Sequence, residues 1–265
     1  MIRFAAITPH PPIIVPTVGR SNLNLCRKTV ETMKNLGEKF RAVKADTIFL
    51  VSPHGPVQYD RFTINYSPFL RGDLSSFGDQ RQFSFENDRE LIDEILENIR
   101  SANLPIGLVR EFELDHGALV PLYYLLNEKD LSYNPKLIHM AFSMLPFDYH
   151  FRLGKVLGEV LQKDSKIIAL VASGDLSHRV TPEAPAGYSP QGRVFDKTLL
   201  ELIRKKNTKG ILNLDPYLIE EAGECGLRSI IILLGILSHL RWEVKSLSYE
   251  APFGVGYAVV NFHIK

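Results

Sequence analysis

Short apolar runs alternate along the chain with segments of helical spacing. Ile2–Thr8 and Thr47–Ser52 are nearly continuous apolar runs, each followed by a proline. Runs of this kind are typical of strands that are buried on both faces. Between them, apolar residues recur at helical spacing from Ser21 to Phe40. These three segments predict a first β-α-β unit.

The alternation continues to the end of the chain. Further strands are predicted at Phe62–Asn65, Ile106–Val109, Leu137–Phe142, Ile167–Ala172, Val244–Tyr249 and Tyr257–Ile264. Further helices are predicted at Asn87–Ala102, Ala118–Leu126, Phe147–Leu161, Gly192–Lys206 and Gly226–His239. This order predicts an α/β fold with a central mixed, largely parallel sheet and helices on both faces. Because no repeat and no linker divides the sequence, we expect a single domain over residues 1–265.

The composition narrows the class of protein. Apolar residues make up 45% and charged residues 23% of the 265, which is typical of a globular chain. The 31 Lys and Arg residues nearly balance the 30 Asp and Glu residues. No basic block is long enough to follow a phosphate backbone, so we expect no nucleic-acid partner.

Neither a membrane nor an oxidising compartment is expected. The most apolar window, Ile230–Leu237, is far shorter than the ~20 residues that a membrane span needs. The N-terminus makes a poor signal peptide, because two prolines follow a short apolar stretch. Cys26 and Cys225 are far apart in sequence and form no disulfide framework. We therefore expect a cytoplasmic protein.

Four histidines follow predicted strands or precede a predicted helix. His10 follows the first strand and His54 the second, each flanked by prolines, while His178 follows the strand at Ile167–Ala172. His116 directly precedes a helix. Because ligands bind open α/β sheets at the carboxyl ends of the strands, we expect these side chains to share one edge. The remaining histidines are assigned to packing or to the surface: His139, His150, His239 and His263.

The segment before the last predicted helix offers a third metal donor. Glu224 and Cys225 lie at that helix N-terminus, where the dipole stabilises an anion. Glu250, at a strand end, is a further candidate. Two imidazoles and a carboxylate form the facial triad of non-haem Fe(II) oxygenases. The same donors suit Zn(II) with a bound water, whereas a thiolate favours softer metals such as Cu(I).

Each of these residues also has a structural alternative. A histidine after a strand is often a hydrogen-bonded loop residue, and Cys225 would pack well as a small apolar residue. The chain lacks the glycine-rich, Walker and nucleophile-elbow motifs of common enzymes. Arg179–Gly192 is polar, rich in proline and glycine, and long for a connection in an α/β domain. We expect this loop to close over a site.

Five motifs together resemble those of a known family. They are Thr8-Pro9-His10-Pro11-Pro12, Ser52-Pro53-His54-Gly55, Leu114-Asp115-His116-Gly117 with Val120-Pro121-Leu122, Ser173-Gly174-Asp175-Leu176-Ser177-His178, and Gly223–Gly226. In this order, from Ile7 to about Leu237, the chain resembles the B-subunit superfamily of class III extradiol ring-cleavage dioxygenases, which includes the protocatechuate 4,5-dioxygenase β-subunit. Within that superfamily it looks most similar to the branch related to Memo-like proteins.

The resemblance implies a role for each motif residue. His10 and His54 match the family's two iron-binding histidines, and His178 matches the histidine that acts as acid and base. His116 matches a histidine that lines the substrate pocket. The family's third ligand is a glutamate before the last helix, whereas the Memo-like branch has a cysteine followed by glycine. Glu224 and Cys225 therefore both stay candidates for the third ligand.

The leading expectation is a mononuclear non-haem Fe(II) extradiol dioxygenase that acts on a catechol or a related aromatic diol with O2. Zn(II) and copper are the alternative metals. The alternative functions are a Memo-like metal-binding or redox protein without ring cleavage, and a zinc-dependent hydrolase with the same ligands. The sequence is compatible with a homo-oligomer and does not fix the oligomeric state.

Overall fold

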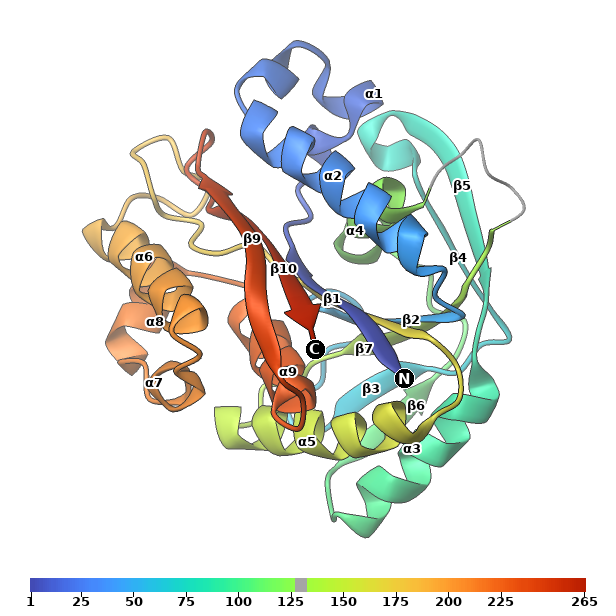
Figure 1. The fold of residues 1–265 in the computed structure, drawn as a ribbon. Coiled ribbons are helices and arrows are strands. Elements are labelled where there is room, and N and C mark those ends of the chain that lie inside the picture. The colour runs from blue at the N-terminus through green and yellow to red at the C-terminus, as the bar shows by residue number, and fades with distance from the viewer. Residues whose placement is uncertain (127–132) are drawn as a thin grey trace.

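One mixed sheet of eight strands forms the centre of the computed structural model, which describes residues 1–126 and 133–265 (Figure 1). In their order across the sheet, the strands are β6 (Ile106–Val109), β3 (Phe62–Asn65), β7 (Lys136–Ala141), β2 (Thr47–Ser52), β8 (Ile168–Ser173), β1 (Ile2–Thr8), β10 (Tyr257–Ile264) and β9 (Trp242–Glu250). The central strands β7, β2, β8 and β1 are parallel. β3 is antiparallel to β7, and β10 is antiparallel to both β1 and β9.

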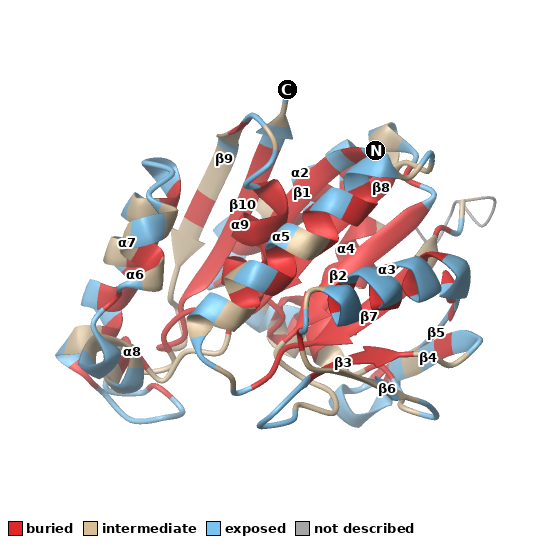
Figure 2. Ribbon diagram, turned by 90° about the horizontal axis from the view of Figure 1, so that it is seen from below, coloured by how far each residue is buried: buried red, intermediate tan, exposed pale blue. Residues whose placement is uncertain are grey.

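Helices cover both faces of this sheet, as Figures 1 and 2 show. One face carries α2 (Arg27–Val43), α4 (His116–Leu125) and the hairpin of β4 (Phe69–Leu74) and β5 (Asp79–Glu86). The other face carries α3 (Arg89–Ser101), α5 (Phe147–Lys163), α6 (Pro190–Arg204) and α9 (Leu227–Leu237). The short elements are α1 (Pro16–Gly19), α7 (Thr208–Leu212), α8 (Pro216–Ala222) and the 3-10 turns Pro12–Ile14, Arg20–Asn24 and Ser75–Phe77. The predicted α/β class with a mixed, largely parallel sheet is confirmed.

The strands divide the core into two clusters, because successive residues of a strand point to opposite faces. On β2, Phe49 and Val51 pack toward α3, α5 and α9, while Ile48 and Leu50 pack toward α2 and α4. Every residue of α9 except Arg228 is buried, since this helix lies between α5 and the sheet. Its apolar run therefore belongs to the core. In residues 1–126 and 133–265, no helix has the length and apolar character to cross a membrane.

The β4–β5 hairpin and the start of α2 differ from the sequence predictions. The hairpin was not predicted, because charged residues and Gly72 interrupt the alternation of its short strands. A Cβ at Gly72 would lie 2.1 Å from the carbonyl oxygen of Leu114, so close backbone packing anchors the hairpin. α2 begins at Arg27 rather than at Ser21, since Arg20–Asn24 forms a separate 3-10 turn.

Candidate metal centre

The topology brings the predicted histidines to one edge of the sheet. β8 lies between β1 and β2 and is parallel to both, so the loops that follow these strands are neighbours. These loops carry His10, His54 and His178. His116, the first residue of α4, reaches the same place, because its ring centroid lies 4.4 Å from that of His54. The expected convergence of the four histidines is therefore seen in the structure.

Three of these histidines form a group that can hold a metal ion. One ring nitrogen each from His10, His54 and His116 lies within 4.8 Å of the other two. His10 is buried, whereas His54 and His116 are half-buried. The group, called the histidine group below, is therefore accessible from solvent on the side of His54 and His116.

A chain of hydrogen bonds fixes which nitrogen of His10 is free. Nδ1 of His10 lies 3.1 Å from Oγ of Ser173, and that hydroxyl donates its own hydrogen to the carbonyl oxygen of Gly117 at 2.5 Å. Because the hydroxyl hydrogen is used, Oγ must accept from Nδ1–H. Nε2 of His10 then carries the lone pair, which is the form that binds a metal.

Asp115 orients His54 in the same way. Its Oδ2 lies 3.3 Å from Nδ1 of His54, and its Oδ1 accepts a hydrogen bond from the backbone N–H of Gly117 at 3.0 Å. One carboxylate thus caps α4 and leaves Nε2 of His54 free. A Cβ at Gly117 would lie 2.9 Å from Cδ2 of His54, so a glycine is needed for this close approach.

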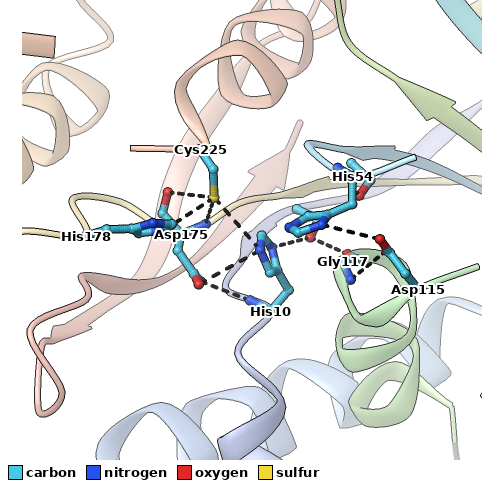
Figure 3. A network of polar contacts seen from close by, with 9 residues as sticks. His10, His54, Asp115, Gly117, Asp175, His178 and Cys225 are labelled. Carbon is cyan, nitrogen blue, oxygen red and sulfur yellow. Dashed lines mark hydrogen bonds and ion pairs between the residues drawn. The ribbon is translucent and has the colours of Figure 1, made fainter. Parts of the chain in front are cut away.

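Cys225 lies beside His10, on the side of His178 and Asp175 (Figure 3). Its Sγ is 3.8 Å from Nε2 of His10 and 3.7 Å from Nε2 of His178. Sγ also accepts a hydrogen bond from the backbone N–H of Asp175 at 3.3 Å. The side chain of Asp175 faces His10, because Oδ1 accepts the backbone N–H of His10 at 3.1 Å and Oδ2 lies 3.9 Å from Nε2.

Two glycines explain how Cys225 reaches this position. A Cβ at Gly174 would lie 2.2 Å from Cα of Gly226, and a Cβ at Gly226 would lie 2.9 Å from the carbonyl oxygen of Asp175. The loop after β8 therefore packs backbone against backbone on the N-terminus of α9. A side chain at either glycine would force these two backbone segments, next to Cys225, to shift.

Burial favours the neutral forms of the groups around the site. It lowers the pKa of His10 well below its ordinary value, with the neighbouring histidines adding to the effect. Burial is also the main reason that the pKa values of His116 and His178 are lowered. It raises the pKa of the Cys225 thiol well above its usual range and that of the Asp175 carboxyl to about 7.

The two adjacent candidates for a third donor point in different directions. Oε2 of Glu224 accepts the backbone N–H of Leu227 at 2.5 Å, so this carboxylate caps α9. Cys225, in contrast, faces His10. Glu250 accepts the backbone N–H of Thr29 at 2.6 Å, close to the N-terminus of α2. Neither Glu224 nor Glu250 belongs to the histidine group.

The remaining predicted features lie around the site. His139 and His150 are buried in β7 and α5, and His239 and His263 are exposed. The loop from Arg179 is shorter than expected, because α6 already begins at Pro190. Its start is held by a hydrogen bond from the N–H of Val180 to the carbonyl of Gly254 at 2.9 Å. Closure of this loop over the site stays a prediction.

Ser173, Asp115 and Asp175 are site residues to which the sequence analysis assigned no role. Ser173 and its partner His10 are 163 positions apart, so only the pairing of β1 with β8 brings them together. Two local signals were present in the sequence. Ser173 is a polar residue at the end of a buried apolar strand, and Asp115 stands directly before a predicted helix, as capping residues do.

The sheet topology and the histidine group at the carboxyl edge of its central strands define an extradiol-dioxygenase-like α/β protein with a candidate metal centre. A family model described as the catalytic LigB subunit of aromatic ring-opening dioxygenase matches residues 4–260. The chain belongs to this family.

The chain is also similar in sequence to proteins from three organisms. Protein CA_C1420 of Clostridium acetobutylicum is 31% identical over 96% of this chain, which spans 56% of that protein's length. The 3,4-dihydroxyphenylacetate 2,3-dioxygenase of Escherichia coli is 23% identical, with 94% of each chain covered. The 2-aminophenol 1,6-dioxygenase beta subunit of Pseudomonas sp. is 25% identical over 97% of this chain and 92% of its own.

A solved structure shares the fold. The crystal structure of the uncharacterized protein JW3007 from Escherichia coli K12 matches with a TM-score of 0.68 at 17% sequence identity. The match covers 98% of this chain and 99% of that one. At this identity the likeness concerns the fold alone.

Proposed function

We propose that this chain is a mononuclear non-haem Fe(II) extradiol dioxygenase that opens the ring of a catechol or a related aromatic diol. The observation that carries the proposal is the paired orientation of His10 and His54. Ser173 and Asp115 accept their Nδ1 hydrogens, which leaves both Nε2 atoms free to bind a metal. We also propose that residues 1–265 form a single domain of this family.

The names of two relatives support the choice of substrate. One relative is named for 3,4-dihydroxyphenylacetate and the other for 2-aminophenol. Both compounds are benzene rings with two hydroxyl or amino groups on neighbouring carbons. Because two such groups can bind one metal ion together, a catechol is the simplest substrate that fits the histidine group.

The donor set fits Fe(II), which binds imidazole nitrogen readily. His10 and His54 would supply two ligands, and the third protein donor would be His116 or Cys225. Glu224 is a weaker fit than either, since its carboxylate caps α9. When bound, Fe(II) would supply neighbouring open positions for the two substrate oxygens and for dioxygen.

His178 would move the proton that the reaction requires. Its Nε2 faces the site, 3.7 Å from Sγ of Cys225, and would accept a hydrogen from a substrate hydroxyl and return it later. An imidazole suits this role because its ordinary pKa of ~6.5 lies close to neutral pH. If Cys225 is the third donor, His116, half-buried beside His54, would instead line the pocket on the side from which the substrate enters.

The direct test is oxygen uptake by iron-loaded protein. The protein would be loaded with Fe(II) without air, its iron content measured, and a panel of catechols and 2-aminophenols added with oxygen. We expect at least one compound to be consumed with one O2 per ring. Iron-loaded protein that takes up no oxygen with any compound would contradict the proposal.

A second candidate function is a metal-binding or redox protein without ring cleavage. The observation in its favour is the Cys225 sulfur 3.8 Å from Nε2 of His10, because thiolate ligands favour softer metals such as Cu(I). Metal analysis of protein purified without added metal distinguishes the two functions. Copper that is lost in Cys225→Ser but kept in Glu224→Gln would support the second function over the first.

A further inference from the structure

An exposed aromatic ring stands beside the histidine group. Phe77 is 41% exposed, and its ring meets that of His116 edge to face, with centroids 5.4 Å apart and planes at 67°. Phe77 ends the 3-10 turn at the tip of the β4–β5 hairpin. Single exposed apolar side chains are ordinary on protein surfaces. Phe77 is notable because its ring contacts a candidate site residue, His116, from a loop tip, where binding residues are common.

The tip of the hairpin is held in place by local polar contacts. Oδ1 of Asp73 accepts the backbone N–H of Ser75 at 2.9 Å, and Gly78 closes the turn with a φ of +93°. Asp79 is buried and accepts a hydrogen bond from the hydroxyl of Thr17, which lies in the segment that follows His10. The hairpin is thus tied to α1, which follows His10 in the chain.

The strands of the hairpin are tied to the segment that leads to His116. The backbone N–H of Leu114 donates to the carbonyl oxygen of Arg71 at 2.7 Å, and Gly72 packs directly on Leu114. Leu114 stands two positions before His116. Phe77 is therefore fixed relative to the histidine group from both sides of the hairpin.

We propose that Phe77 determines specificity by packing against the aromatic ring of the substrate. This inference rests on the proposed function. The flat, apolar ring of Phe77 gains contact with a planar aromatic compound that is held at the histidine group. A chelator of the same metal without an aromatic ring gains no such contact. Phe77 thus selects aromatic compounds from among all those that can bind the metal.

The test compares two chelators on Fe(II)-loaded protein kept without oxygen. 4-Nitrocatechol is the aromatic probe, and acetohydroxamate is a bidentate chelator without an aromatic ring. Dissociation constants are measured for the wild type, Phe77→Ala, Phe77→Tyr and Phe69→Ala, together with iron content and melting temperature. Phe69 is the matched control, because it is 53% exposed on the same hairpin and its ring packs by Arg71.

We expect Phe77→Ala to bind 4-nitrocatechol about fivefold to tenfold more weakly, which is the size of one aromatic contact. Its affinity for acetohydroxamate should stay unchanged. Phe77→Tyr should restore the binding of 4-nitrocatechol, and Phe69→Ala should behave as the wild type. If Phe77→Ala fails to load iron, Phe77→Leu takes its place, since it keeps apolar bulk without an aromatic face.

Two results would overturn the inference alone. Unchanged 4-nitrocatechol binding in Phe77→Ala would show that the ring makes no contact with the substrate, and an equal loss of both chelators would show a structural role only. A different result would overturn the proposed function as well. In that case the iron-loaded wild type would bind acetohydroxamate but not 4-nitrocatechol.

Discussion

At the residue scale, the histidines of the site differ in what holds their rings. His10 and His54 each give their Nδ1 hydrogen to a side-chain oxygen. The sulfur of Cys225 lies 3.8 Å from Nε2 of His10 and 3.7 Å from Nε2 of His178. Rings that are held at Nδ1 are suited to bind a metal at Nε2. Under the proposed function, His10 and His54 would bind the metal through Nε2, and His178 would transfer protons.

Replacing His178 should impair turnover. Loss of a general acid and base costs about 10²–10⁴-fold in rate, so we expect a fall of this size in kcat for His178→Ala with a good substrate. The KM for the diol should change little, because the metal would still hold the substrate. A steady-state comparison with the wild type measures both constants. If kcat stays unchanged while the melting temperature falls, His178 is a loop-stabilising residue instead.

Replacing Asp115 should lower both the stability of the protein and its affinity for the metal. Asp115→Ala removes the cap of α4, which costs about 1 kcal/mol, and also frees the ring of His54. Loss of such a partner typically weakens metal binding ~10–100-fold. Asp215→Ala is the control, since Asp215 caps α8 through the N–H of Tyr217. Competition with a chelating dye should show weaker metal binding in Asp115→Ala only, and equal affinity in both variants would refute the role.

At the element scale, the contact between the loop after β8 and α9 depends on glycine. Gly174→Ala would place a methyl group against the backbone of Gly226, because the new Cβ would lie only 2.2 Å from Cα of Gly226. We expect this to cost about 1–3 kcal/mol of unfolding free energy, as overpacking does. It should also displace Cys225 and weaken any metal binding that involves the thiol.

A second glycine provides the control for this prediction. Gly107 lies in β6, and a Cβ there would meet the flexible side chain of Arg61 at 3.2 Å and the backbone oxygen of Phe62 at 3.9 Å, an ordinary contact distance. The unfolding free energy of Gly107→Ala should stay within about 1 kcal/mol of that of the wild type. Urea denaturation of both variants gives the two values. Equal stabilities would show that the Gly174–Gly226 contact adapts without cost.

The strands of the central sheet could be predicted from the sequence because each is a short run rich in apolar residues. β2 and β8 are buried at every position and were predicted from their apolar runs to within one residue. The β4–β5 hairpin was missed because charged residues and Gly72 interrupt the apolar alternation of its short strands. Its position depends on the contact of Gly72 with Leu114, which no local pattern shows.

Some of the site residues could be predicted from the sequence, but the contacts that hold them could not. His10, His54 and His178 could be singled out because each follows a buried strand. Which side chain holds each ring could not be predicted, since Ser173 meets His10 only through strand pairing. The sequence does not show which of Glu224 and Cys225 faces the histidines. In the structure, Glu224 accepts the backbone N–H of Leu227 and so caps α9, while Cys225 faces His10.

At the scale of the whole molecule, one buried carboxyl joins distant parts of the fold. Asp196 of α6 accepts the hydroxyl of Tyr249 from β9 at 2.6 Å and the backbone N–H of Ser177, next to His178, at 2.8 Å. Burial raises the pKa of Asp196 from 3.8 to about 7, in spite of these hydrogen bonds. The contact therefore links the loop of His178 to the far edge of the sheet.

This carboxyl should make stability depend on pH. Because the folded pKa lies above the unfolded value, the folded state keeps a proton between about pH 4 and 7 that the unfolded chain releases. Its contribution to stability is full below about pH 4 and is lost as the pH rises toward 7. From pH 5 to 8 the free energy of unfolding of the wild type should fall by roughly 2–3 kcal/mol more than that of Asp196→Asn. Urea denaturation at both values checks this, and parallel losses would contradict it.

The proposed function depends most directly on His10 and His54 holding a metal ion that His178 does not hold. Metal content per chain, measured after Fe(II) loading and removal of free metal, tests this division of roles. Loss of one of three protein ligands lowers affinity strongly, so His10→Ala and His54→Ala should keep little iron. His178→Ala should keep as much as the wild type. If His178→Ala loses iron as completely as His10→Ala does, or if all three variants keep it, the assigned roles are wrong.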